Sequence, residues 1–181
     1  MCGICGKFIF NGATIDRALI ERMCQTLTHR GPDAQGVYTS SYIGLGQRRL
    51  SIIDLSSRAV APLTNEDGTV WVVFNGEIYN FQELRRELVA KGHIFQTQTD
   101  TEVLVHLYEE LGTDCLARLR GMFAFAIWDA NQKLLFAARD RLGKKPFNYA
   151  HTGAAFIFGS EIKAIMADPS VPVAPNYYAL D

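Results

Sequence analysis

Apolar residues recur along the chain at two spacings, which predict a mixture of strands and helices. Runs rich in aromatic or β-branched residues between turn residues are typical of strands, and apolar repeats of three or four are typical of half-buried helices. Strands are predicted at 3–10, 36–39, 42–49, 70–75, 122–129, 134–139 and 155–159. Helices are predicted at 16–27, 80–91, 101–111 and 160–167. Runs of strands with helices inserted between them favour a layered α+β domain over a βαβ dinucleotide fold.

Two of these segments carry more detailed predictions. Phe123, Phe125 and Ile127 alternate with small residues, which indicates a strand covered on both faces. The residues 131–133 then turn the chain into the next strand, so an antiparallel hairpin is expected. Thr99 stands three residues before Glu102, the spacing of a capping box at the start of a helix.

Composition narrows the class of protein. The chain has 181 residues, 48% of them hydrophobic, and a formal net charge of -1, which fits one compact domain without a nucleic-acid or anionic membrane partner. It has no bilayer-length apolar run and no secretory signal, so a cytoplasmic location is expected. Three prolines in the segment 168–175 are incompatible with a helix or a central strand. We therefore expect a domain at 2–167 and a linker at 168–181.

The four cysteines are irregularly spaced and match no zinc pattern. We therefore expect free thiols and no structural metal. Cys5 lies three positions after Cys2, so strand alternation predicts that it points to the opposite face, into the core.

Cys2 combines two reactive groups if Met1 is removed, and the small side chain at position 2 permits this removal. An α-amine has a pKa of about 7.7 to 8.0 in model peptides and a thiol about 8.5, so the amine of Cys2 can take its own thiol proton. Considered alone, Cys2 is more often an ordinary small apolar residue in a strand. The rest of the sequence reverses this preference.

Eight segments together resemble the class II glutamine amidotransferases, and specifically the N-terminal domain of asparagine synthetases. The matching segments are CGICG (2–6), HRGPD (29–33), RRLSIIDLS (48–56), FNGEIYN (74–80), TDTEVL (99–104), RLRGMFAFAIWD (118–129), ARDRLGKKPF (138–147) and SEIKAI (160–165). They follow the family order over nearly the whole chain. The resemblance implies the fold of N-terminal nucleophile hydrolases, a four-layer αββα sandwich of two mainly antiparallel sheets.

The resemblance also implies residue roles. Cys2 is the nucleophile, and the Asn75 side chain and the Gly76 N–H stabilise the tetrahedral oxyanion. Arg49 binds the substrate α-carboxylate and Asp100 its α-ammonium. Further substrate contacts, mainly through backbone groups, are implied for Leu50, Ser51, Ile52, Ile53 and Glu77.

Each of these residues also has a commoner structural meaning. Arg49 could be a solvated charge at a strand end, Asn75 and Gly76 a turn, and Asp100 a helix N-cap. His29 is interpreted as structural, because a free amine already supplies the base. Asp140 and Arg141 are interpreted as a strand-end salt bridge with a turn.

The resemblance implies that the domain hydrolyses glutamine to glutamate and ammonia through a Cys2 thioester. The ammonia would serve asparagine synthesis or a related ATP-dependent amidation. No cofactor is expected in this domain; ATP and Mg belong to a synthetase domain, in the same chain or a partner chain, whose Ser-Gly-Gly-x-Asp loop this sequence lacks. A homodimer is compatible with the resemblance.

Two alternatives stay open. The segment 57–63 reads SRAVAPL where the family usually has a Gly and then a Gln or His before the proline, so the domain could be a non-catalytic ammonia-gating or interaction module. The chain could also be another class II amidotransferase with a different acceptor.

Overall fold

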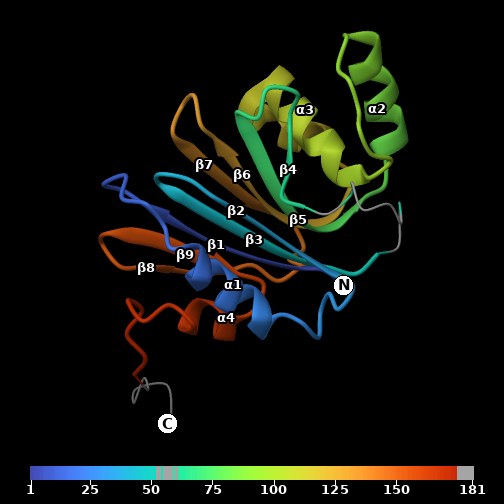
Figure 1. Cartoon of the computed structure of the whole chain (residues 1–181). Coiled ribbons are helices and arrows are strands. Elements are labelled where there is room, and N and C mark those ends of the chain that lie inside the picture. The colour runs from blue at the N-terminus through green and yellow to red at the C-terminus, as the bar shows by residue number, and fades with distance from the viewer. Residues whose placement is uncertain (52–53, 55–58, 60, 175–181) are drawn as a thin grey trace.

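Two antiparallel sheets pack face to face, and helices cover the outer face of each (Figure 1). The computed structural model describes residues 1–51, 54, 59 and 61–174. Within these ranges one sheet has the strand order β2-β3-β1-β9-β8 and the other the order β4-β5-β6-β7. All the strand pairs found there are antiparallel.

The elements have the following bounds. The first sheet contains β1 (Gly3–Ile9), β2 (Ala34–Thr39), β3 (Ile43–Arg49), β8 (Asn148–His151) and β9 (Ala155–Gly159). The second contains β4 (Leu63–Thr64), β5 (Val70–Ile78), β6 (Gly121–Asp129) and β7 (Leu134–Arg139). The helices are α1 (Arg17–Thr26), α2 (Phe81–Ala90), α3 (Asp100–Leu111), the 3-10 helix η2 (Gly112–Arg118) and α4 (Ile162–Met166).

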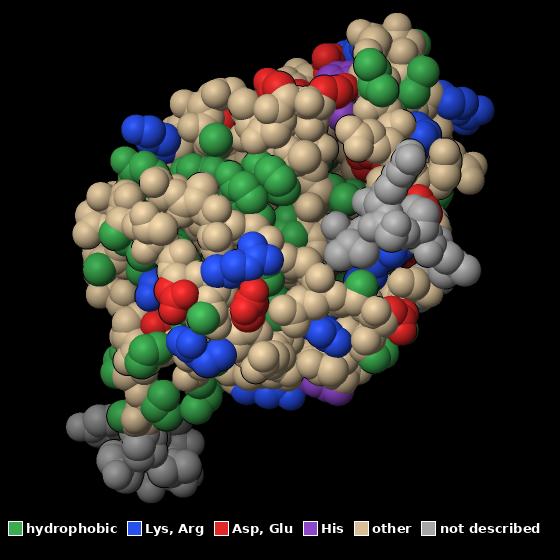
Figure 2. Space-filling model, viewed as in Figure 1, with side chains coloured by type: hydrophobic (Ala, Val, Ile, Leu, Met, Phe, Trp, Pro, Cys, Tyr) green, Lys and Arg blue, Asp and Glu red, His purple; other side chains and the backbone are tan. Residues whose placement is uncertain are grey.

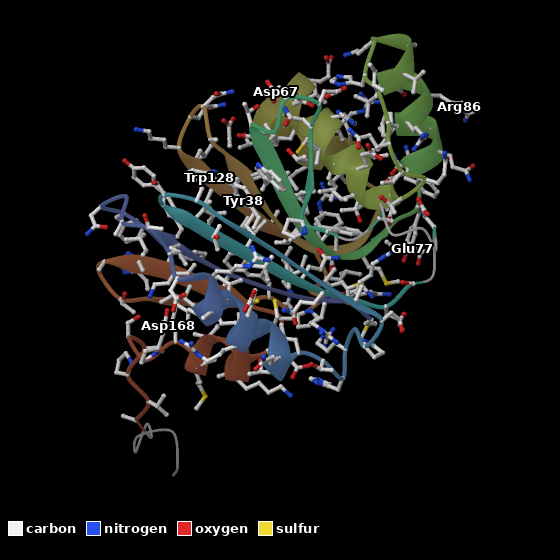
Figure 3. All side chains as sticks on the ribbon, in the orientation of Figure 1. Tyr38, Asp67, Glu77, Arg86, Trp128 and Asp168 are labelled. Carbon is white, nitrogen blue, oxygen red and sulfur yellow. The ribbon has the colours of Figure 1, made fainter. Side chains whose placement is uncertain are left out.

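Three apolar cores hold the four layers together. The middle core lies between the sheets and includes Trp128 and Phe158, both almost fully buried. Tyr38 stacks on Trp71 at 3.9 Å between ring centroids in the same layer, and Figure 3 shows Tyr38 and Trp128 there. The other two cores are packed under α1 and α4 and under α2 and α3. The predicted four-layer αββα sandwich is therefore confirmed.

The central strand β6 and its hairpin agree with the sequence pattern. Phe125 and Ile127 face the helical core, whereas Ala124 and Ala126 face the other sheet. The small side chains let the sheets approach, and both faces of β6 are buried as predicted. β6 pairs with β7 in the expected antiparallel hairpin.

Several elements differ from the prediction. The strands β4 and β8 and the helix η2 were not predicted, because β4 has two residues and β8 reads NYAH without a β-branched residue. β5 continues through Asn75 and Gly76 to Ile78, so the interpretation of Asn-Gly as a turn is wrong.

The start of α3 is capped by Thr99, whose Oγ1 accepts a hydrogen bond from the Glu102 N–H at 3.4 Å. Asp100 is the first helical residue, so its interpretation as the N-cap is wrong. The Glu102 carboxylate does not complete the capping box; it accepts from the backbone N–H groups of Gln96 and Thr97, both at 2.7 Å. Thr99 therefore caps α3 without the reciprocal hydrogen bond from the Glu102 side chain that a capping box would have.

The four cysteines are free thiols, as expected. Cys5 is fully buried and its Sγ lies 3.6 Å from the Cys24 Sγ, which confirms its predicted place in the core. In the described part of the chain, no helix combines the length and the apolar character needed to cross a membrane.

Candidate functional site

A cavity of about 240 Å³ collects most of the residues predicted to act on a substrate. It takes its walls from the residues before β1, the end of β3, the second half of β5 and the start of α3. In Figure 3, Glu77 is labelled near this end of the second sheet. The predicted site residues in its lining are Cys2, Arg49, Leu50, Asn75, Gly76, Glu77 and Asp100.

Cys2 precedes β1, and its main chain is held in place by Arg30, which lies after α1. Its carbonyl oxygen accepts a hydrogen bond from the Arg30 Nε at 3.0 Å, and Arg30 Nη1 is itself 3.0 Å from the Glu161 carboxylate. The Cys2 thiol lies 3.9 Å from the Leu50 carbonyl oxygen and is only partly buried. The backbone of Cys2 is thus fixed while its sulfur lines the cavity.

Asn75 offers a hydrogen-bond donor to the cavity. It lies in β5 opposite Ala124 of β6 and is 1% exposed, yet its Nδ2 has no hydrogen-bond partner among the described residues. Leaving a buried donor unpaired costs about 1–3 kcal/mol, unless a ligand accepts the bond. An amide poised in this way suits an oxygen that gains negative charge.

Gly76 is required for packing and not for an unusual backbone angle. A Cβ at this position would lie 2.3 Å from the Met122 carbonyl oxygen of β6. Gly76 is absent from the described residues with positive φ. Only glycine lets β5 lie this close to β6, which keeps the backbone at Asn75 and Gly76 rigid.

Gln47 joins the two sheets beneath the cavity. It lies in β3, is 4% exposed, and its Oε1 accepts a hydrogen bond from the Phe74 N–H of β5 at 2.8 Å. Arg49 lies two residues after Gln47 in β3, and Asn75 directly follows Phe74 in β5. Sequence reasoning missed Gln47, which stands two residues before Arg49 and follows the apolar and glycine residues of β3.

Arg49 and Asp100 bring opposite charges to the same cavity, and each is 6% exposed. The Arg49 guanidinium donates to the Asp54 carbonyl oxygen, and the Asp54 carboxylate accepts from the Gln98 N–H at 2.8 Å. The solvated strand-end interpretation of Arg49 is therefore wrong. This network also connects the segment after β3 to the residues before α3.

Asp100 is a buried carboxylate that accepts a hydrogen bond from the Ile78 N–H at 2.9 Å. Burial raises the pKa of Asp100 to about 6, because desolvation disfavours the charged form, and the nearby Glu77 carboxylate raises it further. A cationic ligand group would restore the charged form. The raised pKa is what a site for a substrate ammonium is expected to show before it binds.

Of the remaining residues predicted to contact the substrate, some line the cavity and others do not. Leu50 lines the cavity through the segment after β3, and Glu77 is an exposed residue of β5 at its rim. Ser51 is not in the lining; its N–H donates to the Asp33 carboxylate at 2.7 Å, which anchors the segment. Ile52 and Ile53 lie outside the described residues.

Lys145 is a second residue that sequence reasoning missed. It is 6% exposed, lines the cavity, and its Nζ lies 3.3 Å from the Met1 Sδ. The signal for it was the polar GKKP segment after β7.

The turn that contains Lys145 is held by Asp140, whose carboxylate accepts hydrogen bonds from the N–H groups of Leu142, Lys144 and Lys145. No ion pair with Asp140 exists among the described residues, so the predicted salt bridge with Arg141 is wrong and the predicted turn is confirmed.

The HRGPD segment lies outside the cavity and supports it. His29 donates from its Nε2 to the Glu161 carboxylate at 2.9 Å and is absent from the cavity lining. Arg48 donates to the carbonyl oxygens of Gly31 at 2.8 Å and Pro32 at 3.3 Å. Both side chains fix the loop between α1 and β2 and leave Arg49 as the arginine that lines the cavity.

The cavity therefore combines a thiol, an unpaired amide donor, a guanidinium and a buried carboxylate. This set fits a small zwitterion whose head group lies between Arg49 and Asp100 and whose side chain reaches Cys2. In the part of the chain that the structure describes, one cluster of potential metal ligands occurs, and it lies outside this cavity.

Comparisons with known proteins agree with this geometry. Two relatives from Bacillus subtilis (strain 168), asparagine synthetase [glutamine-hydrolyzing] 3 and asparagine synthetase [glutamine-hydrolyzing] 1, are each 46% identical to this chain. The matches cover 94% and 92% of this chain but 28% and 27% of those proteins. The chain thus spans about a quarter of their length.

Two solved structures have the same fold. The glutamine phosphoribosylpyrophosphate amidotransferase from B. subtilis, in complex with ADP and GMP, matches with a TM-score of 0.73 and 23% identity. A structure described as the allosteric regulatory enzyme of purine biosynthesis matches with a TM-score of 0.75 and 22% identity. Each match covers 92% of this chain and 43% of the other. The family model of the glutamine amidotransferase domain matches residues 1–181, and the chain therefore belongs to that family.

Proposed function

We propose that this domain hydrolyses the side-chain amide of glutamine to glutamate and ammonia through a thioester on Cys2. The observation that carries the proposal is the unpaired Asn75 amide in a cavity that also contains the Cys2 thiol. Arg49 and Asp100 supply the charges that would bind the α-carboxylate and the α-ammonium of the same substrate. Arg49 suits a carboxylate because its planar fork can bind both oxygens.

The reaction begins after removal of Met1, when the α-amine belongs to Cys2. The amine takes the thiol proton, and the sulfur forms a bond to the amide carbon of glutamine. The carbonyl oxygen becomes an oxyanion that accepts hydrogen bonds from the Asn75 Nδ2 and the Gly76 N–H. The proton then passes to the amide nitrogen, the C–N bond breaks and ammonia leaves. Water adds to the thioester, and breakage of the C–S bond releases glutamate and the thiol.

We further propose that the ammonia is used by a synthetase domain, in this chain or in a partner chain, to amidate aspartate or a related carboxylate with ATP and Mg. The two 46% identical relatives are named as asparagine synthetases and are much longer than the matched segment. The predicted linker at 168–181 would lead toward that domain. Its first residue, Asp168, is still part of the folded unit, because its carboxylate lies 2.6 Å from the Lys7 Nζ.

The test is glutamate release by the Met1-processed protein and by two alanine variants. Cys2→Ala removes the proposed nucleophile, whereas Cys5→Ala removes a nearby thiol of β1 that is buried in the core. Loss of turnover in Cys2→Ala with near-normal turnover in Cys5→Ala supports the proposal. Unchanged glutamate release in Cys2→Ala refutes it.

A non-catalytic gating or interaction module is the second candidate, favoured by the altered segment 57–63. Part of that segment is outside the described residues, but Ala59 lines the cavity. A protein that keeps Met1 has no amine on Cys2, so intact mass spectrometry separates the candidates. A mature chain that retains Met1 and lacks glutaminase activity favours the module. For the acceptor, the full-length protein is given glutamine, ATP, Mg and aspartate, and asparagine formation is measured.

A further inference from the structure

Four side chains from three separate segments meet in the outer helical layer, away from the candidate active-site cavity. Glu66 comes from the turn between β4 and β5, His93 from the connection between α2 and α3, and His106 and Glu109 from α3. One nitrogen or carboxylate oxygen of each lies within 4.8 Å of the corresponding atom of every other. Figure 3 labels Asp67, the neighbour of Glu66, beside α3, and Figure 2 shows histidine and carboxylate side chains together at this end of the molecule.

The separations between these atoms match a four-coordinate metal site. The His106 Nδ1 lies 3.0 Å from the Glu109 Oε2 and 3.5 Å from the Glu66 Oε2. The His93 Nδ1 lies 3.8 Å from the Glu109 Oε2 and 3.8 Å from the Glu66 Oε1. In a tetrahedral zinc site with bonds of about 2.0–2.1 Å, donor atoms lie about 3.3–3.4 Å apart. The observed nitrogen–oxygen separations, from 3.0 to 3.8 Å, lie on either side of that value.

Both carboxylates have one oxygen occupied by the surrounding protein. The Glu66 Oε1 accepts a hydrogen bond from the Ile94 N–H at 2.9 Å, and the Glu109 Oε1 accepts from the Asn65 Nδ2 at 2.7 Å. These bonds fix the orientation of each carboxylate. The Oε2 atom of each is the one that lies near His106.

Both histidines likewise have their second ring nitrogen next to a further carboxylate. The His93 Nε2 lies 3.3 Å from the Glu110 Oε1. The His106 Nε2 lies 3.9 Å from the Glu102 Oε1 and is buried, without a hydrogen-bond partner among the described residues. Metal-bound histidines almost always direct the other nitrogen toward a carboxylate, a carbonyl or water, which fixes the tautomer. Each Nδ1 is thereby left for the centre of the cluster.

A proton on His106 would explain part of this arrangement but not all of it. It would account for the approach of the Glu66 and Glu109 carboxylates to His106. It does not account for His93, whose Nδ1 approaches the same two carboxylates and whose ring centroid is 4.7 Å from that of His106. Two imidazolium rings so close would repel each other, whereas one divalent cation attracts all four groups.

We propose that Glu66, His93, His106 and Glu109 bind one divalent transition-metal ion, with zinc as the occupant. Two imidazole nitrogens and two carboxylate oxygens fill all four positions of a tetrahedral zinc ion and leave none open for a substrate. The ion joins the β4–β5 turn, the α2–α3 connection and α3. The cysteine spacing predicted no structural metal; the ligands are histidines and glutamates, and only His106 and Glu109 are close in sequence.

The experiment measures zinc in the full-length protein after chelator treatment and reloading with zinc ions. The double variant Glu66→Gln with His93→Gln changes two ligands that are not fully buried, so it avoids the risk that a His106 variant fails to fold. The matched control is Glu21→Gln with His151→Gln, two partly or fully exposed residues elsewhere on the surface. The wild type and the control should bind one zinc equivalent more than the ligand variant. Zinc should raise the thermal midpoint of the wild type and of the control, but not that of the ligand variant.

Cobalt(II) then reports the geometry. Replacement of zinc by cobalt should give the intense visible absorption of a tetrahedral complex in the wild type and the control, and none in the ligand variant. Equal zinc content and equal thermal shifts in the wild type and the ligand variant would overturn the proposal. So would a wild type that takes up no zinc at micromolar concentration. The Cys2→Ala protein should keep the metal, so this test is independent of glutaminase activity.

Discussion

The side-chain oxygen of Gln47 accepts a hydrogen bond from the backbone N–H of Phe74 at 2.8 Å, across the space between the two sheets. The bond connects β3, which ends at Arg49, to β5, which contains Asn75. It therefore sets the distance between the proposed carboxylate-binding group and the proposed oxyanion donor. Gln47 is 4% exposed, so water cannot readily replace it.

Gln47→Met should destabilise the protein, because the Phe74 N–H is then buried without an acceptor. The expected loss is about 1–3 kcal/mol in the free energy of unfolding. Urea unfolding followed by circular dichroism gives this value, with Gln25→Met on the exposed face of α1 as the control. If Gln47 also positions the site, kcat should fall in the variant at saturating glutamine. A variant as stable as the control would show that the inter-sheet bond contributes nothing.

Asn75→Ala should slow turnover far more than it weakens glutamine binding, because the amide donates mainly to the oxyanion. Removal of one such donor lowers kcat about 10²–10³-fold in other enzymes. The stability of the free protein should not fall, since the buried amide Nδ2 has no partner among the described residues to lose. Steady-state kinetics measure the effect. A rise in KM at constant kcat would instead place Asn75 in ground-state binding.

The sequence alone predicted the strands and helices that carry strong apolar patterns. The chemistry depended on the resemblance, because Asn75, Gly76 and Asp100 each had a commoner structural meaning. Gln47 escaped prediction, since a buried polar residue in a strand has no local signal and its partner is distant in sequence. The polar segment that contains Lys145 did not show that the fold would bury its side chain in the cavity. The His93 and His106 cluster escaped for the same reason, because the fold brings its segments together.

Asp100→Asn should stabilise the free protein at neutral pH while it impairs glutamine binding. Burial raises the pKa of Asp100 from 3.8 to about 6 in the folded state. The associated stability is present below pH 3.8 and is lost as the pH rises through about 6, which amounts to about 3 kcal/mol. Asparagine does not ionise and can still accept the Ile78 hydrogen bond, so the variant avoids this loss.

Chemical unfolding of wild type and Asp100→Asn between pH 4 and pH 8 measures this difference. The variant should gain most at pH 8 and nearly nothing at pH 4. Asp140→Asn is the control of opposite sign: although burial raises the pKa of Asp140, backbone hydrogen bonds lower it below 3.8. That variant should lose stability at pH 8. Equal pH profiles for wild type and Asp100→Asn would contradict the raised pKa.

Glutamine affinity should fall as the pH drops through about 6, because protonated Asp100 offers no charge to the substrate ammonium. Cys2→Ala protein allows binding to be measured by calorimetry without turnover, so the pH dependence of the chemical step does not interfere. The dissociation constant should rise about tenfold for each pH unit below 6, as one proton competes with the ligand. In the Cys2→Ala, Asp100→Asn double variant, binding should be weak and nearly constant from pH 5 to pH 8. A slope that survives in the double variant would assign the titration to another group.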